Sequence, residues 1–134
     1  MREILFRGQL RRKGEKVNMA GEPLPSIWKY GGVSQYGGGA MIYQAEPKIE
    51  KFPVYGDTVG QYTGLRDKNG TRIFEGDIVE HERHMHIVAY NDEYAGFWPF
   101  YDQDHPAGYG VIGEESEVIG NIHDNPELLK GEAE

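Results

Sequence analysis

Residues 59–90 alternate short apolar segments with turn-forming residues, and no other feature limits the possible folds as strongly. Asn69-Gly70 separates the segments 59–65 and 71–74, and both residues tolerate the positive φ angles of a type I′ turn. Glu75-Gly76-Asp77 forms a second tight-turn signal before the next apolar segment. The stretch therefore predicts successive antiparallel β-hairpins.

The composition also favours strands, because isoleucine and valine total 18 residues against 6 leucines, and tyrosine occurs 9 times. Further strands are expected at 86–90, 97–101 and 117–122. Asn125 is suited to cap a short helix with Pro126 at its first position. These signals predict a mainly β fold: a small, partly open or closed β-barrel, similar in style to SH3 or OB domains, with a short C-terminal helix.

A chain of 134 residues is typical of one domain, which we expect to span residues 1–134. Alternation breaks down at about 21–51, where Pro23, Pro25 and the glycine run 37–39 occur. This Gly/Pro-rich stretch predicts a long loop or insertion.

The absence of cysteine excludes disulfides, thiolate metal sites and cysteine nucleophiles. No apolar run approaches the roughly 20 residues of a membrane span, and the alternating start of the chain differs from a signal peptide. We therefore expect a cytoplasmic protein that does not contact membranes.

Three blocks of sequence, residues 1–8, 59–79 and 117–129, resemble the YopX family of bacteriophage and prophage proteins. The resemblance implies a mainly β fold, a phage or prophage origin and no established biochemical activity. It offers no catalytic motif to transfer. The matching residues are interpreted as structural turn and cap positions: Gly64, Asn69, Gly70, Gly76, Asp77, Asn125 and Pro126. The sequence departs from the family pattern between Lys16 and Tyr55.

Two clusters contain metal-binding residue types. On a strand, Glu82, His84 and His86 would share one face, and imidazole and carboxylate groups suit zinc or manganese. Asp102, Asp104 and His105 alternate carboxylates with a nearby imidazole, but a Pro-Ala-Gly turn follows. Solvent-facing strand and turn residues explain both clusters more simply, so we predict no metal and no cofactor.

Aromatic residues are the stronger functional signal. Trp28, Tyr30 and Tyr36 lie in the Gly-rich stretch, and Trp98 and Tyr101 lie in a predicted hairpin. Exposed tryptophan and tyrosine are common in protein interfaces and stack on single-stranded nucleic acids. The alternative is that a small core uses these rings to bury area.

Together these features predict a non-enzymatic binding module that self-associates and binds a host or phage protein. Residues 75–134 carry two basic and fifteen acidic side chains, which would attract a basic partner. The first alternative is a nucleic-acid-binding barrel that uses Arg66, Lys68, Arg72 and the basic turn 11–13, although the net charge of −8 disfavours it. The second alternative is a metal-dependent hydrolase.

Overall fold

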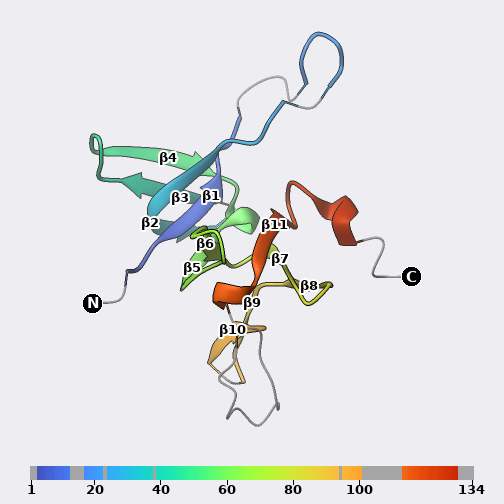
Figure 1. The fold of residues 1–134 in the computed structure, drawn as a ribbon. Coiled ribbons are helices and arrows are strands. Elements are labelled where there is room, and N and C mark those ends of the chain that lie inside the picture. Colours follow the sequence, from blue (N-terminus) through green and yellow to red (C-terminus); the bar gives the residue numbers. More distant parts are fainter. Residues whose placement is uncertain are drawn as a thin grey trace. The chain divides into compact units, whose positions relative to one another are not determined.

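A computed structural model describes most of the chain, namely residues 3–12, 17–22, 24–37, 39–93, 95–100 and 113–129. The chain divides into two compact units (Figure 1). We call residues 4–61 the N-terminal unit, and residues 1–3 with 62–134 the C-terminal unit. Both are built from antiparallel strands, so the mainly β prediction is confirmed. The expectation of one domain over residues 1–134 stays a prediction.

The N-terminal unit is a curled antiparallel sheet with strand order β4-β3-β2-β1-β5. A single turn of 3₁₀ helix, η1, precedes β5, which continues into the C-terminal unit. The elements are β1 (Phe6–Gln9), β2 (Trp28–Tyr36), β3 (Gly39–Gln44), β4 (Glu50–Val54), η1 (Gly56–Thr58) and β5 (Gly60–Arg66).

The prediction of a loop at about 21–51 is wrong, because most of that stretch forms β2, β3 and the start of β4. Two of its glycines, Gly31 and Gly39, permit close packing. A Cβ atom on Gly31 would lie 2.0 Å from the carbonyl oxygen of Tyr43, and one on Gly39 would lie 3.1 Å from the Tyr36 ring. Glycine thus marks crowded strand positions here, whereas it suggested a loop in the sequence.

The core of the N-terminal unit contains Ala40, Ile42 and Val54, with Phe6 and Val33 packed against them. Gly8 on β1 lies so close to β4 that an added Cβ would be 2.8 Å from Val54 Cγ2.

Among the described residues, the strands do not close into a barrel. The continuation of β1 meets β4 at one isolated bridge, Leu10 with Val54, supported by the hydrogen bonds Arg11 N to Pro53 O and Tyr55 N to Gln9 O, each 2.9 Å. The prediction therefore holds for β structure but not for a closed barrel, because one bridge is too short a contact to complete the hydrogen-bonded ring.

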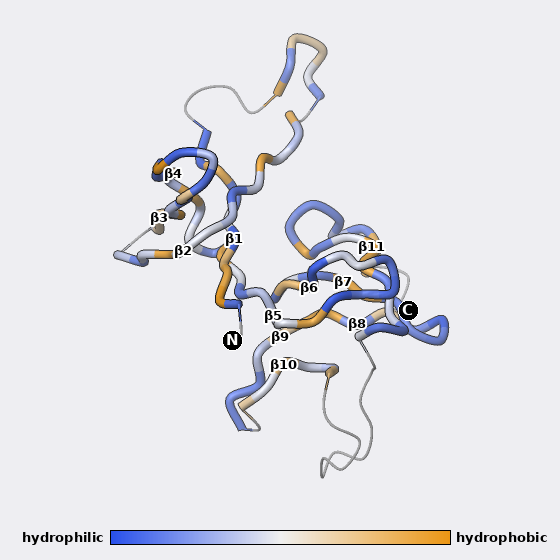
Figure 2. Tube along the Cα trace, turned by 60° about the vertical axis from the view of Figure 1, so that its left-hand side comes forward, coloured by the Kyte–Doolittle hydropathy of each residue, from blue (hydrophilic) through white to orange (hydrophobic). Residues whose placement is uncertain are grey.

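The C-terminal unit contains three sets of paired strands: β5 with β6, β9 with β10, and β7 between β8 and β11. Ile73, Val79 and Val88 form its core, with Phe100 and Val118 packed around them. Figure 2 shows hydrophobic residues in β6, β7 and β11 among hydrophilic turns. The elements are β6 (Arg72–Phe74), β7 (Asp77–His81), β8 (His84–Ile87), β9 (Ala89–Asn91), β10 (Gly96–Trp98), η2 (Gly113–Glu115), β11 (Glu117–Asn121) and η3 (Pro126–Leu129).

The hairpin predicted at Asn69-Gly70 forms, but its turn type differs. Gly70 has a φ of 83°, whereas Asn69 does not have a positive φ, so the type I′ prediction is wrong. Gly70 N donates to Asp67 O at 3.0 Å, and Asp67 N donates to Thr71 O at 2.9 Å. The loop is therefore 68–70, three residues long with glycine in the left-handed region.

The two other turn glycines have distinct roles. Gly76, with a φ of 92°, lies in the predicted turn, where Asp77 accepts a 2.7 Å hydrogen bond from Phe74 N on its Oδ2 atom. Gly64 instead lies inside β5 with a φ of 88°, where the β5–β6 register shifts. It marks an irregularity in the strand and not a turn.

The predicted C-terminal helix is absent from the described residues, and η3 is only a short 3₁₀ segment. Asn125 does precede Pro126, but its Oδ1 atom accepts a 3.2 Å hydrogen bond from Asn121 N in β11. Asn121 Oδ1 in turn accepts from His123 N and Asp124 N. The two asparagines thus fix the turn after β11. The Asn125 side-chain oxygen bonds to the end of β11 and does not cap the N–H groups of η3.

Candidate functional site

One face of the β2–β3 hairpin carries four aromatic side chains. Alternate residues of a strand share a face, which places Trp28, Tyr30 and Tyr36 together on β2. Tyr43 joins them because it lies directly opposite Gly32 in the β2–β3 register. We call Trp28, Tyr30, Tyr36 and Tyr43 the aromatic face. Tyr30, Tyr36 and Tyr43 are 46%, 50% and 46% exposed, whereas Trp28 is half-buried.

Two cations lie beside these rings. The Arg7 guanidinium lies 4.6 Å from the centre of the Trp28 ring, and Lys51 is the cross-strand partner of Tyr43. On the opposite face, Val33 and Ile42 point into the core, and Lys29 Nζ lies 4.2 Å above the Phe52 ring. The core face is therefore apolar apart from Lys29, whereas the exposed face carries the aromatic rings beside Lys51, with Arg7 buried under Trp28.

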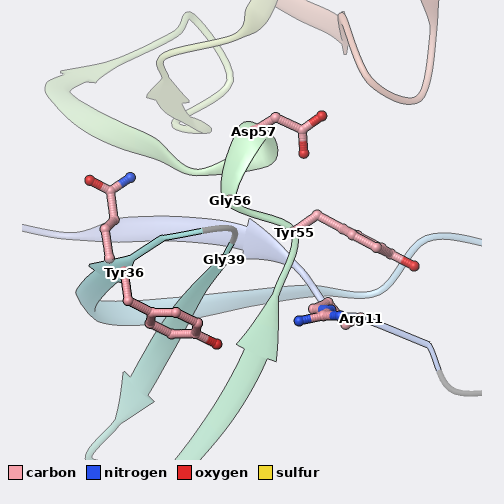
Figure 3. Close-up of a pocket in the computed structure, with 7 residues that line it drawn as sticks. Arg11, Tyr36, Gly39, Tyr55, Gly56 and Asp57 are labelled. Carbon is pink, nitrogen blue, oxygen red and sulfur yellow. The ribbon is translucent and has the colours of Figure 1, made fainter.

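A groove of about 610 Å³ opens at one end of the same unit (Figure 3). Figure 3 shows Gly39 and Gly56 between the rings of Tyr36 and Tyr55, and Tyr55 between Asp57 and Arg11. We call this site the tyrosine groove. It is lined by Arg11, Gln35, Tyr36, Gly39, Tyr55, Gly56 and Asp57.

Backbone hydrogen bonds hold the walls of the tyrosine groove. Arg11 and Tyr55 are fixed by the two bonds that join β1 and β4. Thr58 Oγ1 donates to Tyr55 O at 2.6 Å and accepts from Gln9 N at 2.9 Å. The corner that carries Tyr55, Gly56 and Asp57 is thus set before any ligand binds, which lowers the entropy cost of binding.

The sequence indicated part of this region and missed the rest. Trp28, Tyr30, Tyr36 and Arg11 had been singled out, but Gln35, Tyr55 and Asp57 had not. The Tyr55-Gly56-Asp57 segment is a turn signal that follows the apolar end of β4. This signal predicts a turn between two strands at the position where the tyrosine groove lies.

The three candidate metal residues Glu82, His84 and His86 do not all lie on one strand. Glu82, with a φ of 51°, and Arg83, with a φ of 69°, form the two-residue turn between β7 and β8, so Glu82 is outside the strand that holds His84 and His86. His86 makes an edge contact with Trp98, at 6.4 Å between ring centres. Within the described part of the chain, no group of three His, Asp or Glu residues is arranged to hold a metal ion.

The nucleic-acid alternative used the basic turn 11–13 together with Arg66, Lys68 and Arg72, and of these last three Lys68 and Arg72 form ion pairs. Lys68 Nζ lies 3.3 Å from Glu117 Oε2, and Arg72 lies 2.9 Å from Glu3 Oε1. Arg66 donates to Gly70 O within its own hairpin. Carboxylates beside these cations weaken the positive field that a phosphate backbone requires.

Other predicted residues fall elsewhere. Trp98 is 39% exposed on β10, at a distance in sequence from the aromatic face. Tyr101, Asp102, Asp104, His105 and Lys13 lie outside the described residues. None of the helical segments in the described ranges has the length and apolar character of a membrane span.

Comparison with known proteins places the chain in a family. The YopX protein family matches residues 34–130. No curated protein matches the chain. A similar solved structure is the crystal structure of protein EF1440 from Enterococcus faecalis, with 28% identity, 96% of this chain and 99% of that chain covered, and a TM-score of 0.45. Because the family match covers more than half of the sequence, this chain belongs to the YopX family.

Proposed function

We propose that this protein is a non-enzymatic, self-associating binding module, and that the aromatic face contacts a second copy of the chain. The observation that carries the proposal is the exposure of Tyr30, Tyr36 and Tyr43 on one face of a regular sheet. Tyrosine supplies a large contact area with few rotatable bonds, and aromatic residues are enriched at interfaces. A phage or prophage origin, a cytoplasmic location and a host or phage partner stay predictions.

Charge supports a second copy as the occupant. The N-terminal unit has eight basic and five acidic residues, a net charge of +3, whereas the C-terminal unit has six basic and seventeen acidic residues, a net charge of −11. Opposite units of two copies therefore attract each other, and like units repel each other. We expect the N-terminal unit of one copy to contact the C-terminal unit of another.

Light scattering coupled to size-exclusion chromatography tests this proposal on the full chain. We expect a mass above that of the monomer at low ionic strength, and a shift toward monomer as salt screens the charges. Replacing both Tyr30 and Tyr43 with serine should produce monomers at low ionic strength. Tyr90→Ser is the matched control, because Tyr90 is 47% exposed but lies on β9 of the C-terminal unit.

A monomeric wild-type protein at high concentration and low salt would contradict the proposal, as would an unchanged mass in the double tyrosine variant. A gel shift with DNA or RNA that is lost at moderate salt would instead favour the nucleic-acid-binding alternative.

A further inference from the structure

We propose that the tyrosine groove binds an extended, proline-containing peptide segment of a partner protein, with an acidic side chain of the peptide at Arg11 and a basic side chain at Asp57. The inference rests on the proposed function only in that the protein binds other proteins. It concerns a different surface, since apart from Tyr36 no residue of the aromatic face lines the groove.

The shape of the groove suits a main chain flanked by rings. Gly39 and Gly56 contribute only backbone between the two tyrosines, and the Tyr36 ring packs against Gly39, where an added Cβ would lie 3.1 Å from the ring. Aromatic-lined grooves recognise proline-rich segments because the polyproline conformation is already extended and loses little entropy on binding. A volume of about 610 Å³ is that of a ligand pocket and fits a short peptide segment.

A neighbouring groove shows how this unit contacts a proline-containing segment of its own chain, which forms one wall of that groove. It shares Tyr55 as a wall and is lined also by Leu24 and Ser26, which flank Pro25. The guanidinium of Arg12 donates to the carbonyl oxygen of Pro25, and Gln9 Nε2 donates to Ser26 Oγ at 3.0 Å. Arg11 is more exposed than Arg12 and lines the tyrosine groove together with Tyr55, so its guanidinium is available to the polar groups of a partner's segment.

The charges of the groove select the peptide. Arg11 and Asp57 are both exposed, and Figure 3 shows them on different sides of the Tyr55 ring. A ligand with one acidic and one basic side chain is attracted at both sites. A nucleic-acid strand would be attracted by Arg11 but repelled by the Asp57 carboxylate, so the groove favours a peptide over a polyanion.

Nuclear magnetic resonance titration of the full-length, ¹⁵N-labelled protein tests the inference. The probe is a synthetic proline-rich peptide of about ten residues, long enough to extend past the groove, with one glutamate and one lysine near its ends. We expect saturable shifts centred on the amides of Arg11, Tyr36, Tyr55, Gly56 and Asp57. The comparison probes are the same peptide with serine in place of proline, and a short oligothymidine.

Arg11→Glu should weaken peptide binding by about fivefold or more, because an attractive rim charge becomes repulsive. Lys48→Glu is the control, since Lys48 is an exposed cation of the same unit that pairs with Glu50 at 3.4 Å and does not line the groove. Circular dichroism checks that both variants are folded. Equal binding of the serine peptide, a preference for oligothymidine, or no binding by the folded wild-type protein overturns the inference.

The two proposals fail separately. The Tyr30→Ser/Tyr43→Ser variant should lose self-association and keep peptide binding, because neither residue lines the groove. Arg11→Glu should lose peptide binding and keep the same oligomeric mass as Lys48→Glu, which changes the charge of the N-terminal unit by the same amount. A variant of the groove that also abolishes self-association would show that the groove is part of the interface between copies, and would overturn its assignment as a peptide site.

Discussion

Val118 donates its backbone N–H to the Oδ2 atom of Asp67 over 2.9 Å, joining positions 51 residues apart. The Oδ1 atom of the same carboxylate accepts from Asn69 N and Thr71 N, each at 2.9 Å. Asp67 is only 5% exposed. One buried carboxylate therefore fixes both the β5–β6 hairpin loop and the position of β11.

Replacing Asp67 with asparagine should destabilise the protein by about 2 kcal/mol or more, because hydrogen bonds to a charged acceptor are lost and the amide group would meet a backbone donor. Urea denaturation followed by circular dichroism measures the effect as a lower midpoint at unchanged slope. Asp92→Asn is the control, since Asp92 is exposed in the turn after β9. Equal midpoints for the two variants would contradict the role given to Asp67.

Acid should remove the same contribution in the wild-type protein. Burial raises the pKa of Asp67, but hydrogen bonds from Val118, Thr71 and Asn69 and the charge of Lys68 together lower it below its ordinary value of 3.8. Because the pKa is lower in the folded state, the contribution is fully present above the unfolded pKa and is lost as pH falls toward the folded pKa. The urea midpoint should therefore fall more steeply below about pH 5 in wild type than in Asp67→Asn. Parallel profiles would exclude this explanation.

The β7–β8 turn should be improvable. Glu82 and Arg83 both have positive φ, which asparagine and glycine adopt at lower cost. Glu82→Asn with Arg83→Gly leaves the net charge unchanged and should stabilise the protein by about 1 kcal/mol, raising the melting temperature by several degrees. Differential scanning calorimetry measures the change. Glu82→Gln alone keeps the unfavourable conformation, so a similar gain in that variant would refute the strain argument.

Gly8→Ala should destabilise the protein by about 1–3 kcal/mol, because the methyl group would overlap Val54 in the core of the N-terminal unit. Gly32→Ala is the matched control on the neighbouring strand, where an added Cβ meets nothing within 4 Å. Chemical denaturation of both variants gives the comparison. The double variant Gly8→Ala/Val54→Ala should lose less stability than the sum of the losses in the two single variants. The smaller side chain at position 54 makes room for the added methyl group.

Local sequence signals predicted turns better than they predicted how strands associate. Gly70 and Gly76 lie in the expected turns because short-range backbone preferences decide such positions. The loop expected at about 21–51 became strands because β2, β3 and β4 are stabilised by cross-strand contacts such as Val33 with Ile42, which no short window of sequence reveals. The sequence predicts a type I′ turn at Asn69-Gly70, but two consecutive positive φ angles occur at Glu82-Arg83 instead. Neither glutamate nor arginine favours a positive φ, so the sequence did not indicate this turn.

The candidate site was predictable only in its parts. Trp28, Tyr30 and Tyr36 stood out as aromatic residues, but their common face follows from the strand that the sequence concealed. Tyr43 belongs to the aromatic face because of the β2–β3 register. Tyr55 and Asp57 belong to the tyrosine groove because of the bridge between Leu10 and Val54. These pairings join residues that are distant in the sequence. A single sequence shows which residue types are present but not which of them become neighbours in the fold.

The link between Asp67 and Val118 also sets an order of events during synthesis on the ribosome. All strand partners of β1 to β4 lie within residues 4–61, so that sheet can assemble while later residues are still being translated. The β5–β6 hairpin is completed later, because Val118, which donates to the Asp67 carboxylate, lies in β11. The same strand also pairs with β7. Nascent chains that end before residue 117 would therefore carry an ordered first half and an unfinished second half, which makes the arrival of β11 the step that joins the β5–β6 hairpin and β7 within the C-terminal unit.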